Sequence, residues 1–462
     1  MKPFCLLIAS VCLLLLGACR KDSFITSADA RLSITVDTLK YDTLFTSTGS
    51  VTQSFKIINE NNQKLRLNEV RLMGGTNSNY RMNVDGDAGV AASNIEIEAN
   101  DSIYVFVQVK VDPASGQLPF IVQDSIRIQY NGNERWVQLE AWGQNAHFLR
   151  GHEVSTDETW TNDLPYVILD YLYVAPGATL TLEKGCRLYM HADAPVVVDG
   201  SLQVNGAADS VDRVYFTGDR LDAPYNRYPA AWPGIFFRAT SNSNVLNYAV
   251  IRNAYQAIAI EGNNTGSGAQ LSLQQCIIDN AYDAGILATN AHIDAQNSLI
   301  SNCGRNLVLS AGGHYQFIHC TVVSISNTYI NHKDPVLWLS DNDGNGNNFN
   351  LNALFRNCIF WGEGGLTENE VLTDRKGAAA FSASFDHVLW KVTATPANVT
   401  STNVINEPPQ FDSIDAPRHY YDFRLKDSSP ALEAGTVTPL TIDLDGKPRP
   451  VGLPDLGCYE RQ

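Results

Sequence analysis

Alternation of hydrophobic and polar residues, the pattern of strands with one buried face, fills residues 32–142. In residues 103–109, for example, every second side chain is Ile or Val. Groups rich in Asn and Gly, as at 59–62 and 131–132, separate about seven such runs and indicate turns. This pattern, without any helical periodicity, predicts an immunoglobulin-like β-sandwich over residues 31–145. The Cys–Trp–Cys set typical of antibody domains is absent, so the pattern predicts the architecture only.

After Gly143 the strand-like runs become shorter and follow one another closely up to Phe237. Gly-containing pairs such as Pro-Gly, Asp-Gly and Asn-Gly separate them. Residues 176–235 contain P-G-A-T-L-x-L-E-x-G, V-D-G-x-L-x-V-N-G, V-x-F-T and W-P-G-I in succession. This succession resembles the opening coils of right-handed parallel β-helix proteins.

The sequence between residues 250 and 361 repeats. Five apolar segments share one register, with first residues spaced by 27, 22, 23 and 37: 250–253, 277–280, 299–302, 322–325 and 359–361. A period in the twenties predicts stacked coils, and the longer gaps indicate loops pushed out of a coil. We therefore expect these side chains to lie together in one interior: Ile251, Ile278, Ile300 and Val323. The chain is thus predicted to be all-β, with the right-handed parallel β-helix over residues 146–395.

Small residues directly precede four of the repeated segments: Cys276, Ser298, Cys320-Thr321 and Cys358. Cysteines stacked at one inward position would act as small apolar residues, so we expect buried free thiols there. Disulfide pairing is the alternative, because it is possible outside the cytoplasm.

Three asparagines follow the repeated segments at the matching turn: Asn253, Asn280 and Asn302. Side-chain amides stacked in this way can bond one another and the backbone of the turn. We expect a structural ladder of amides at this position.

The last segment, residues 396–462, is rich in Pro and Asp and lacks the period. Its motifs D-x-D-G-x-P-R-P at 443–450 and D-x-G-x-Y-E at 455–460 resemble the tail of many secreted bacterial β-helix proteins. We predict a C-terminal cap here, because an open coil end leaves strand edges unpaired.

The N-terminus has a different pattern: Lys2 is followed by an apolar run over 4–16, too short to span about 30 Å of hydrocarbon comfortably. Such a run is typical of a signal peptide. Leu16-Gly17-Ala18-Cys19 closes it and resembles the bacterial lipobox.

The lipobox resemblance implies cleavage after residue 18 and acyl chains, palmitate among them, at Cys19. The expected signal peptide is then 1–18, and the polar residues 19–30 form a tether. Acyl chains attach a protein to a membrane without spanning it. We expect attachment to the outer membrane, and the sequence does not distinguish its periplasmic face from its cell-surface face. A plain secretory signal with an incidental cysteine is the alternative.

The chain as a whole resembles a group of bacterial outer-membrane lipoproteins in which a β-sandwich precedes a right-handed parallel β-helix of the pectin-lyase-like fold. The resemblance covers nearly all of the chain. It implies the architecture and no defined activity, because one fold hosts many functions.

The net charge of −16 argues against nucleic acid as a partner, because phosphate binding needs a cationic surface. The sequence shows no run of Lys and Arg. A polyanionic ligand would therefore need a basic patch assembled by the fold.

The β-helix fold also occurs in polysaccharide lyases and hydrolases. The N-T-D, D-D, G-H-G and R-I-K motifs of polygalacturonase-like hydrolases are absent from this sequence. Asp279 and Asp283 lie four residues apart at a turn and are the nearest approach to the paired carboxylates of a glycosidase. Arg252 and Arg305 are candidate bases for a lyase. A polysaccharide lyase or glycoside hydrolase with a divergent groove remains the alternative to a binding protein.

One loop has the oxygen-rich pattern that suits Ca²⁺, in which alternate side chains are ligands and a glycine allows the turn. Its candidate ligands are Asp341, Asp343 and Asn345. The Glu expected at the twelfth position is replaced by Asn352, so a solvated loop without metal is the alternative. No other cofactor is expected.

The insertion 219–233 interrupts a coil and should project from it, and loops on a rigid scaffold often bind ligands. Three of its aromatic residues could stack on sugar rings: Tyr225, Tyr228 and Trp232. Trp232 could instead pack in the interior, because W-P-G-I matches a coil segment. We therefore expect a lipid-anchored envelope scaffold for binding or adhesion, with a glycan as ligand and without catalysis. A purely structural envelope component is the third possibility.

Overall fold

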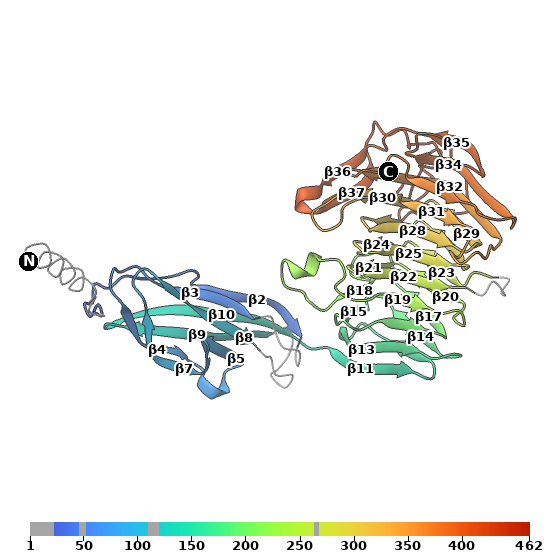
Figure 1. Ribbon diagram of the computed structural model, residues 1–462. Helices are drawn as coiled ribbons and strands as arrows, with labels where there is room; N and C mark the ends of the chain where they lie inside the picture. Colours follow the sequence, from blue (N-terminus) through green and yellow to red (C-terminus); the bar gives the residue numbers. More distant parts are fainter. Residues whose placement is uncertain (1–22, 46–51, 110–119, 263–267) are drawn as a thin grey trace, which may run out of the picture. The chain divides into compact units, whose positions relative to one another are not determined.

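A computed structural model describes residues 23–45, 52–109, 120–262 and 268–462 (Figure 1). The chain is nearly all β and divides after Asn145 into two compact units. No helix in the described part of the chain is long and apolar enough to cross a membrane. The expected signal peptide and Cys19 lie outside the described residues.

The first unit consists of two five-stranded sheets that share one hydrophobic core. One sheet is antiparallel, in the order β1 (Leu32–Ile34), β3 (Gln53–Asn59), β8 (Ser102–Val109), β5 (Tyr80–Val84) and β6 (Asp87–Gly89). The other has the order β2 (Thr38–Phe45), β10 (Asn133–Gln144), β9 (Phe120–Tyr130), β4 (Leu65–Leu72) and β7 (Ala91–Ile97). In this second sheet β2 and β10 are parallel, and the other pairs are antiparallel. A single 3₁₀ turn, η1 (Gly75–Asn77), follows β4.

Burial in the first unit follows the alternation of the sequence. In β8, Ile103, Val105, Val107 and Val109 are buried, while Tyr104 and Phe106 between them are exposed. Alternate side chains of a strand point to opposite faces, so the apolar set lies against the other sheet. The strand expected at 103–109 is therefore confirmed.

The second unit contains one sheet of 25 short strands in chain order. Its strands are β11 (His147–Val154), β12 (Glu158–Trp160), β13 (Tyr166–Val174), β14 (Thr179–Glu183), β15 (Arg187–Met190), β16 (Val196–Val198), β17 (Ser201–Asn205), β18 (Val214–Gly218), β19 (Ile235–Phe237), β20 (Asn244–Asn247), β21 (Ala249–Arg252), β22 (Gln256–Glu261), β23 (Leu271–Gln274), β24 (Ile277–Asp279), β25 (Ala284–Thr289), β26 (His292–Gln296), β27 (Leu299–Ser301), β28 (Arg305–Ser310), β29 (Gly313–Ile318), β30 (Thr321–Ile325), β31 (Leu337–Ser340), β32 (Leu351–Glu363), β33 (Val371–Asp374), β34 (Phe381–Trp390) and β35 (Val399–Ile405).

Through the middle of this unit each strand pairs in parallel with the third strand after it, as β19 does with β22 and β22 with β25. The chain therefore contributes one strand to each of three rows per turn, a topology compatible with a parallel β-helix. Figure 1 shows the strands stacked one above another from β11 to β35. The parallel pairing extends to Ile405, ten residues beyond the predicted end at residue 395.

The interior of the stack follows the predicted repeat for three of the four expected positions. Ile251 lies beside Ile278, and Ile278 beside Ile300, all of them buried. The next partner is Val322 and not Val323, so the predicted register is wrong by one residue at β30.

The misplaced register has a physical reason. Val323 is also fully buried, but it belongs to a second hydrophobic cluster with Trp361 and Leu456 on the other face of the strand. A strand buried on both faces loses its alternation, and a shift by one residue then leaves no trace in the sequence.

All six cysteines of the second unit are buried and unpaired. Cys276, Cys320 and Cys358 lie in the main core, as expected for free thiols. Burial raises the pKa of the Cys276 thiol to about 12. These thiols therefore pack as small apolar groups.

The C-terminal segment lies along the side of the coils. It begins with a hairpin of β36 (Phe411–Asp415), a 3₁₀ turn η3 (Ala416–Arg418) and β37 (Tyr420–Leu425). Tail side chains such as Leu444 and Leu456 pack on Leu299 and Ile359 of the stack. Of the predicted cap over 396–462, β35 thus pairs with β34 at the end of the stack, whereas the later residues cover a lateral face.

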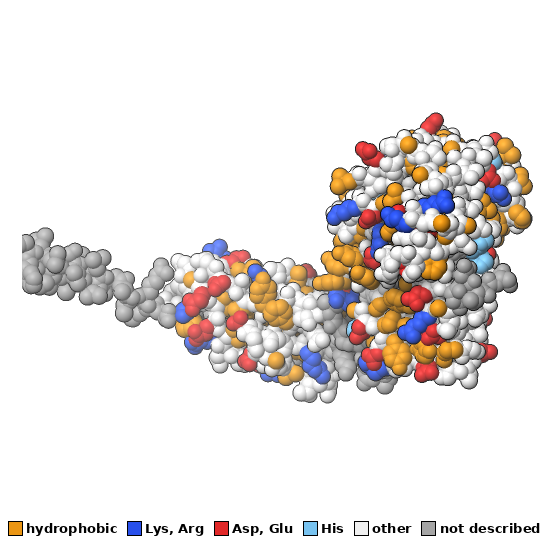
Figure 2. Space-filling model, turned by 45° about the vertical axis from the view of Figure 1, so that its right-hand side comes forward, with side chains coloured by type: hydrophobic (Ala, Val, Ile, Leu, Met, Phe, Trp, Pro, Cys, Tyr) orange, Lys and Arg blue, Asp and Glu red, His pale blue; other side chains and the backbone are white. Residues whose placement is uncertain are grey.

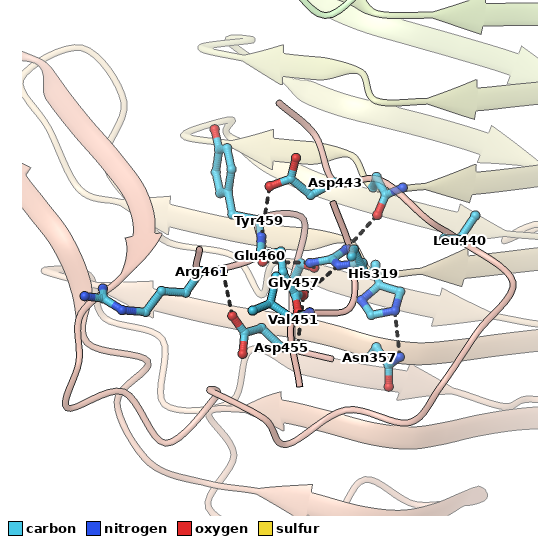
Figure 3. Close-up of polar contacts among 12 residues, drawn as sticks. His319, Asn357, Leu440, Asp443, Val451, Asp455, Gly457, Tyr459, Glu460 and Arg461 are labelled. Atoms are coloured by element: carbon cyan, nitrogen blue, oxygen red, sulfur yellow. Dashed lines mark hydrogen bonds and ion pairs between the residues drawn. The ribbon is translucent and has the colours of Figure 1, made fainter. Parts of the chain in front are cut away.

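The tail motif forms a buried polar network (Figure 3). The Arg449 guanidinium donates to Glu460 Oε2 at 2.9 Å, to Asn297 Oδ1 at 2.6 Å and to the carbonyls of Gly457 and Tyr459. The Glu460 backbone N–H donates to Asp443 Oδ2 at 3.0 Å. The polar residues of the motif therefore hold the tail together and bond it to the stack.

Candidate functional site

The predicted binding loop connects β18 to β19 and contains one 3₁₀ turn, η2 (Tyr225–Arg227). Tyr225 and Tyr228 are 41% and 37% exposed, and their ring centroids lie 5.2 Å apart. The Arg220 guanidinium lies 3.8 Å from the centroid of the Tyr225 ring. Both tyrosines therefore offer part of their ring faces to solvent, as expected.

The asparagine ladder anchors this loop. Asn280 donates from Nδ2 to Asn253 Oδ1 at 2.8 Å and to the carbonyl of Arg227 at 2.9 Å. Asn253 donates from Nδ2 to the carbonyl of Asn226 at 2.9 Å. Asn302, the third predicted member, instead donates from Nδ2 to Asp279 Oδ1 at 3.3 Å. The first two members of the predicted ladder thus bond each other and hold the aromatic loop against the coils.

Rings from two distant segments extend the tyrosine pair. The Tyr228 ring lies 5.1 Å from Tyr329, which follows β30, and the Tyr329 ring stacks on His419 at 4.4 Å and 12°. His419 comes from the hairpin of the tail. Three segments far apart in the sequence therefore form one aromatic cluster of Tyr225, Tyr228, Tyr329 and His419.

A polar hollow of about 210 Å³, here the first hollow, adjoins this cluster. Its walls include Arg227, Arg252, Asp279, Asn280, His419 and Tyr421. Burial and the nearby Arg227 charge lower the pKa of His419, which keeps its imidazole neutral near pH 7. Burial raises the pKa of Tyr421 to about 12, and a hydrogen bond with the Asn327 side chain acts in the opposite direction.

A second hollow of about 280 Å³ shares Tyr329 with the aromatic cluster. Its walls include Tyr282, Asp283, Arg305, Tyr329 and Lys333. The exposed rings of Tyr255 and Tyr282 stack beside it at 5.8 Å and 28°. Both hollows therefore combine exposed aromatic rings with hydrogen-bonding groups.

The candidate catalytic aspartates line different hollows. Asp279 accepts from Ser301 Oγ at 2.7 Å and lies 3.8 Å from Arg252 Nε. Asp283 forms an ion pair with Arg305 and accepts from Gln256 Nε2 at 2.7 Å. Each carboxylate is thus bonded to neighbouring groups, and the two do not face one bond as a glycosidase pair does.

Trp232, the third predicted binding residue, is 1% exposed and lies in the main core. Its indole N–H donates to the carbonyl of Arg252 at 2.9 Å. Its ring is therefore closed to a ligand, in agreement with the packing alternative.

The predicted Ca²⁺ ligands bond to different stretches of backbone. Asp341 is buried and accepts from the N–H groups of Lys376 and Gly377 at 2.8 and 3.3 Å. Asp343 accepts the N–H of Asn345 at 2.8 Å and of Asn347 at 3.1 Å, within its own loop. No group of three His, Cys, Asp or Glu side chains that could hold a metal ion occurs among the described residues. These hydrogen bonds favour the alternative of a loop without metal, although Asp341 is buried and not solvated.

Sequence patterns did not indicate several residues at this site. Tyr329, His419 and Tyr421 lie in segments without the repeat, and their spacing from the 219–233 insertion predicts no contact. Only the stacking of the coils and the lateral course of the tail bring them together.

No protein-family model matches the sequence, and no curated protein matches it. Among solved structures, a protein of unknown function from Porphyromonas gingivalis W83 aligns with 27% of this chain and 50% of its own, at 18% identity and a TM-score of 0.20. A family 123 glycoside hydrolase from Clostridium perfringens, studied for glycolipid glycan hydrolysis, aligns with 26% of this chain and 30% of its own, at 9% identity and a TM-score of 0.19.

A Pseudomonas fluorescens alkylpurine DNA glycosylase bound to DNA aligns with 25% of this chain and 31% of its own, at 10% identity and a TM-score of 0.17. The chain thus spans half or less of the length of each of these proteins. Similarities at this level carry no argument about function.

Proposed function

We propose that this protein is a lipid-anchored glycan-binding scaffold of the bacterial outer membrane, facing the periplasm or the cell exterior. In this proposal an immunoglobulin-like sandwich follows the anchor at Cys19, and a right-handed parallel β-helix presents the binding site. The protein attaches to the membrane through its N-terminal lipid and binds a glycan as its ligand. Nucleic acid is not among its proposed partners.

One observation carries the glycan proposal: partly exposed tyrosines gather beside two hollows lined by amide, carboxylate and guanidinium groups. A sugar ring offers apolar C–H groups on its faces and hydroxyl groups around its edge. Flat aromatic rings suit the first, and hydrogen-bonding side chains suit the second. The rigid stack below the loop would hold these groups in place before the ligand binds.

The test compares binding of the purified protein with that of matched tyrosine variants on a panel of pectins, alginates and host glycans. Tyr225→Ala and Tyr228→Ala should weaken binding to the best ligand about tenfold, because each removes a stacking face. Tyr171→Ala is the control, since Tyr171 is 43% exposed and lies in β13 of the same unit, outside both hollows. Equal affinity for all four proteins would contradict the proposed site.

The same panel distinguishes a binding protein from an enzyme. A scaffold releases no reducing or unsaturated ends, with or without Ca²⁺. Release that disappears with Asp279→Asn or Arg252→Ala would make the protein a polysaccharide lyase or hydrolase instead.

A further inference from the structure

The first hollow has one more cation than carboxylate among its lining residues, and in the second hollow the two numbers are equal. Four cations line them, one from each of four separate segments, together with three carboxylates: Arg227, Arg252, Arg305 and Lys333, with Asp279, Asp283 and Asp334. The whole chain has a net charge of −16. Figure 2 shows acidic and basic side chains interspersed among exposed hydrophobic ones, with no continuous acidic field on the face shown. The fold thus brings together four cations that are far apart in the sequence, with a net excess of one positive charge.

Two of the four cations are already matched by a carboxylate. Arg305 forms an ion pair with Asp283, and the Arg252 guanidinium lies 3.8 Å from Asp279. Each of these pairs leaves little charge for a ligand.

The other two cations, one in each hollow, lack a carboxylate partner. Arg227 and Lys333 are exposed, and neither side chain forms an ion pair with any part of the chain that the structure describes. The positive potential of Arg227 reaches the neighbouring ring, since it contributes to the lowered pKa of His419. Each hollow therefore contains one cation without an ion pair among the described residues, and in the second hollow the exposed carboxylate of Asp334 offsets the charge of Lys333.

We propose, on the basis of the glycan-binding function above, that the ligand is an acidic glycan whose sugars bear a carboxylate or a sulfate. The tyrosines hold the ring faces, while Arg227 and Lys333 bind the anionic groups. A guanidinium presents a planar fork of N–H donors that matches a carboxylate or sulfate, and an ammonium adds a point charge.

The test uses ligand pairs that differ only in charge, with the full mature chain. Oligogalacturonate is compared with its methyl ester, and a sulfated galactan oligosaccharide with its desulfated form, by titration calorimetry. The charged member of at least one pair should bind about tenfold more tightly than its neutral form. That advantage should shrink when NaCl rises from about 0.05 M to about 0.5 M, because salt screens exposed charges. The pair that shows the advantage identifies the anionic group.

Substitution then assigns the charge to its residue. Arg227→Gln or Lys333→Gln should reduce the tenfold advantage to about twofold, whereas Lys184→Gln, which removes an exposed cation paired with Asp212 outside the hollows, should preserve it. Equal affinity for the charged and neutral members of both pairs would overturn the acidic-ligand proposal and leave the glycan proposal standing. Absence of binding to any glycan on the panel would overturn both.

Discussion

Asparagine side chains have a double role at the turns of the stack. Asn253 and Asn280 adopt φ angles of 61° and 59°, in the left-handed region where side chains other than Gly and Asn are strained. Their amides then bond each other and the loop of Tyr225 and Tyr228. One residue type therefore satisfies the turn and fixes the position of the binding loop.

Removal of one asparagine of the ladder should destabilise both the turn and the binding loop. Asn280→Ala loses two hydrogen bonds and places a Cβ in the left-handed region, so we expect the free energy of unfolding to fall by about 2 kcal/mol. Asn280→Gly loses the same bonds without the strain and should be less destabilising. Urea denaturation measures the difference, and trypsin should cleave after Arg227 faster in both variants. Unchanged cleavage would show that the ladder does not hold the loop.

His319 should make stability depend on pH. Thr436 fixes the Asn357 amide through both its N–H and its carbonyl, so Asn357 donates from Nδ2 to His319 Nε2 at 2.8 Å and the imidazole must be neutral (Figure 3). Burial and the nearby Arg449 lower the pKa of His319 to about 2. The unfolded chain, with a pKa near 6.5, therefore binds a proton that the folded protein does not, so stability is complete above about pH 6.5 and falls below it.

Between pH 7 and pH 5 this effect should lower the free energy of unfolding by about 2 kcal/mol. The measurement is urea denaturation at both pH values for the protein and for His319→Gln. The variant should lose about 2 kcal/mol less than the parent over this interval, because all other groups titrate alike in both. An equal loss in the two proteins would assign the pH dependence to other groups.

At the scale of elements, the lateral tail depends on one buried ion pair. Arg449 and Glu460 are almost fully enclosed, and the arginine fork also bonds Asn297 and two carbonyls. A buried charge that loses its partner is expensive, whereas an exposed pair contributes little. The Arg449–Glu460 pair therefore holds the tail together, and the bond from Arg449 to Asn297 is one of several that attach the tail to the stack.

Arg449→Ala should lower the free energy of unfolding by about 3–5 kcal/mol, since Glu460 would remain buried without a partner. Arg418→Ala is the matched control: Arg418 is a highly exposed arginine of the same tail and should cost less than about 0.5 kcal/mol. Denaturant titration of both variants checks the difference. A loss below 1 kcal/mol for Arg449→Ala would show that the network contributes little.

The elements also show how far the sequence could predict this fold. The repeat correctly predicted that Ile251, Ile278 and Ile300 lie in one row, because their strands keep one apolar face inward. It failed at Val323, where the tail buries the second face. The tyrosines of the loop were visible as exposed aromatic residues, but their neighbours Tyr329 and His419 come together only through tertiary structure, which local patterns do not contain.

At the scale of the whole molecule, the chain has two compact units and a distinct N-terminal sequence. The proposed anchor depends on one thiol. Cys19→Ala should abolish labelling by palmitate and leave uncleaved precursor, because no other cysteine stands at the expected cleavage point. Cys12→Ala, within the expected signal peptide, should preserve labelling and serves as the control. Mass spectrometry that finds an unmodified mature chain starting elsewhere than residue 19 would contradict the anchor.

The lateral course of the tail affects how the stack comes apart. In a stack of coils each turn touches only its neighbours, so turns can open one at a time from an end. Here one segment bonds Arg213, Asn297 and Asn357, which belong to coils far apart along the stack. Opening any of these coils must also break the tail away from the others. The tail therefore joins turns that would melt singly into one cooperative unit, and a chain trimmed of it would fray coil by coil.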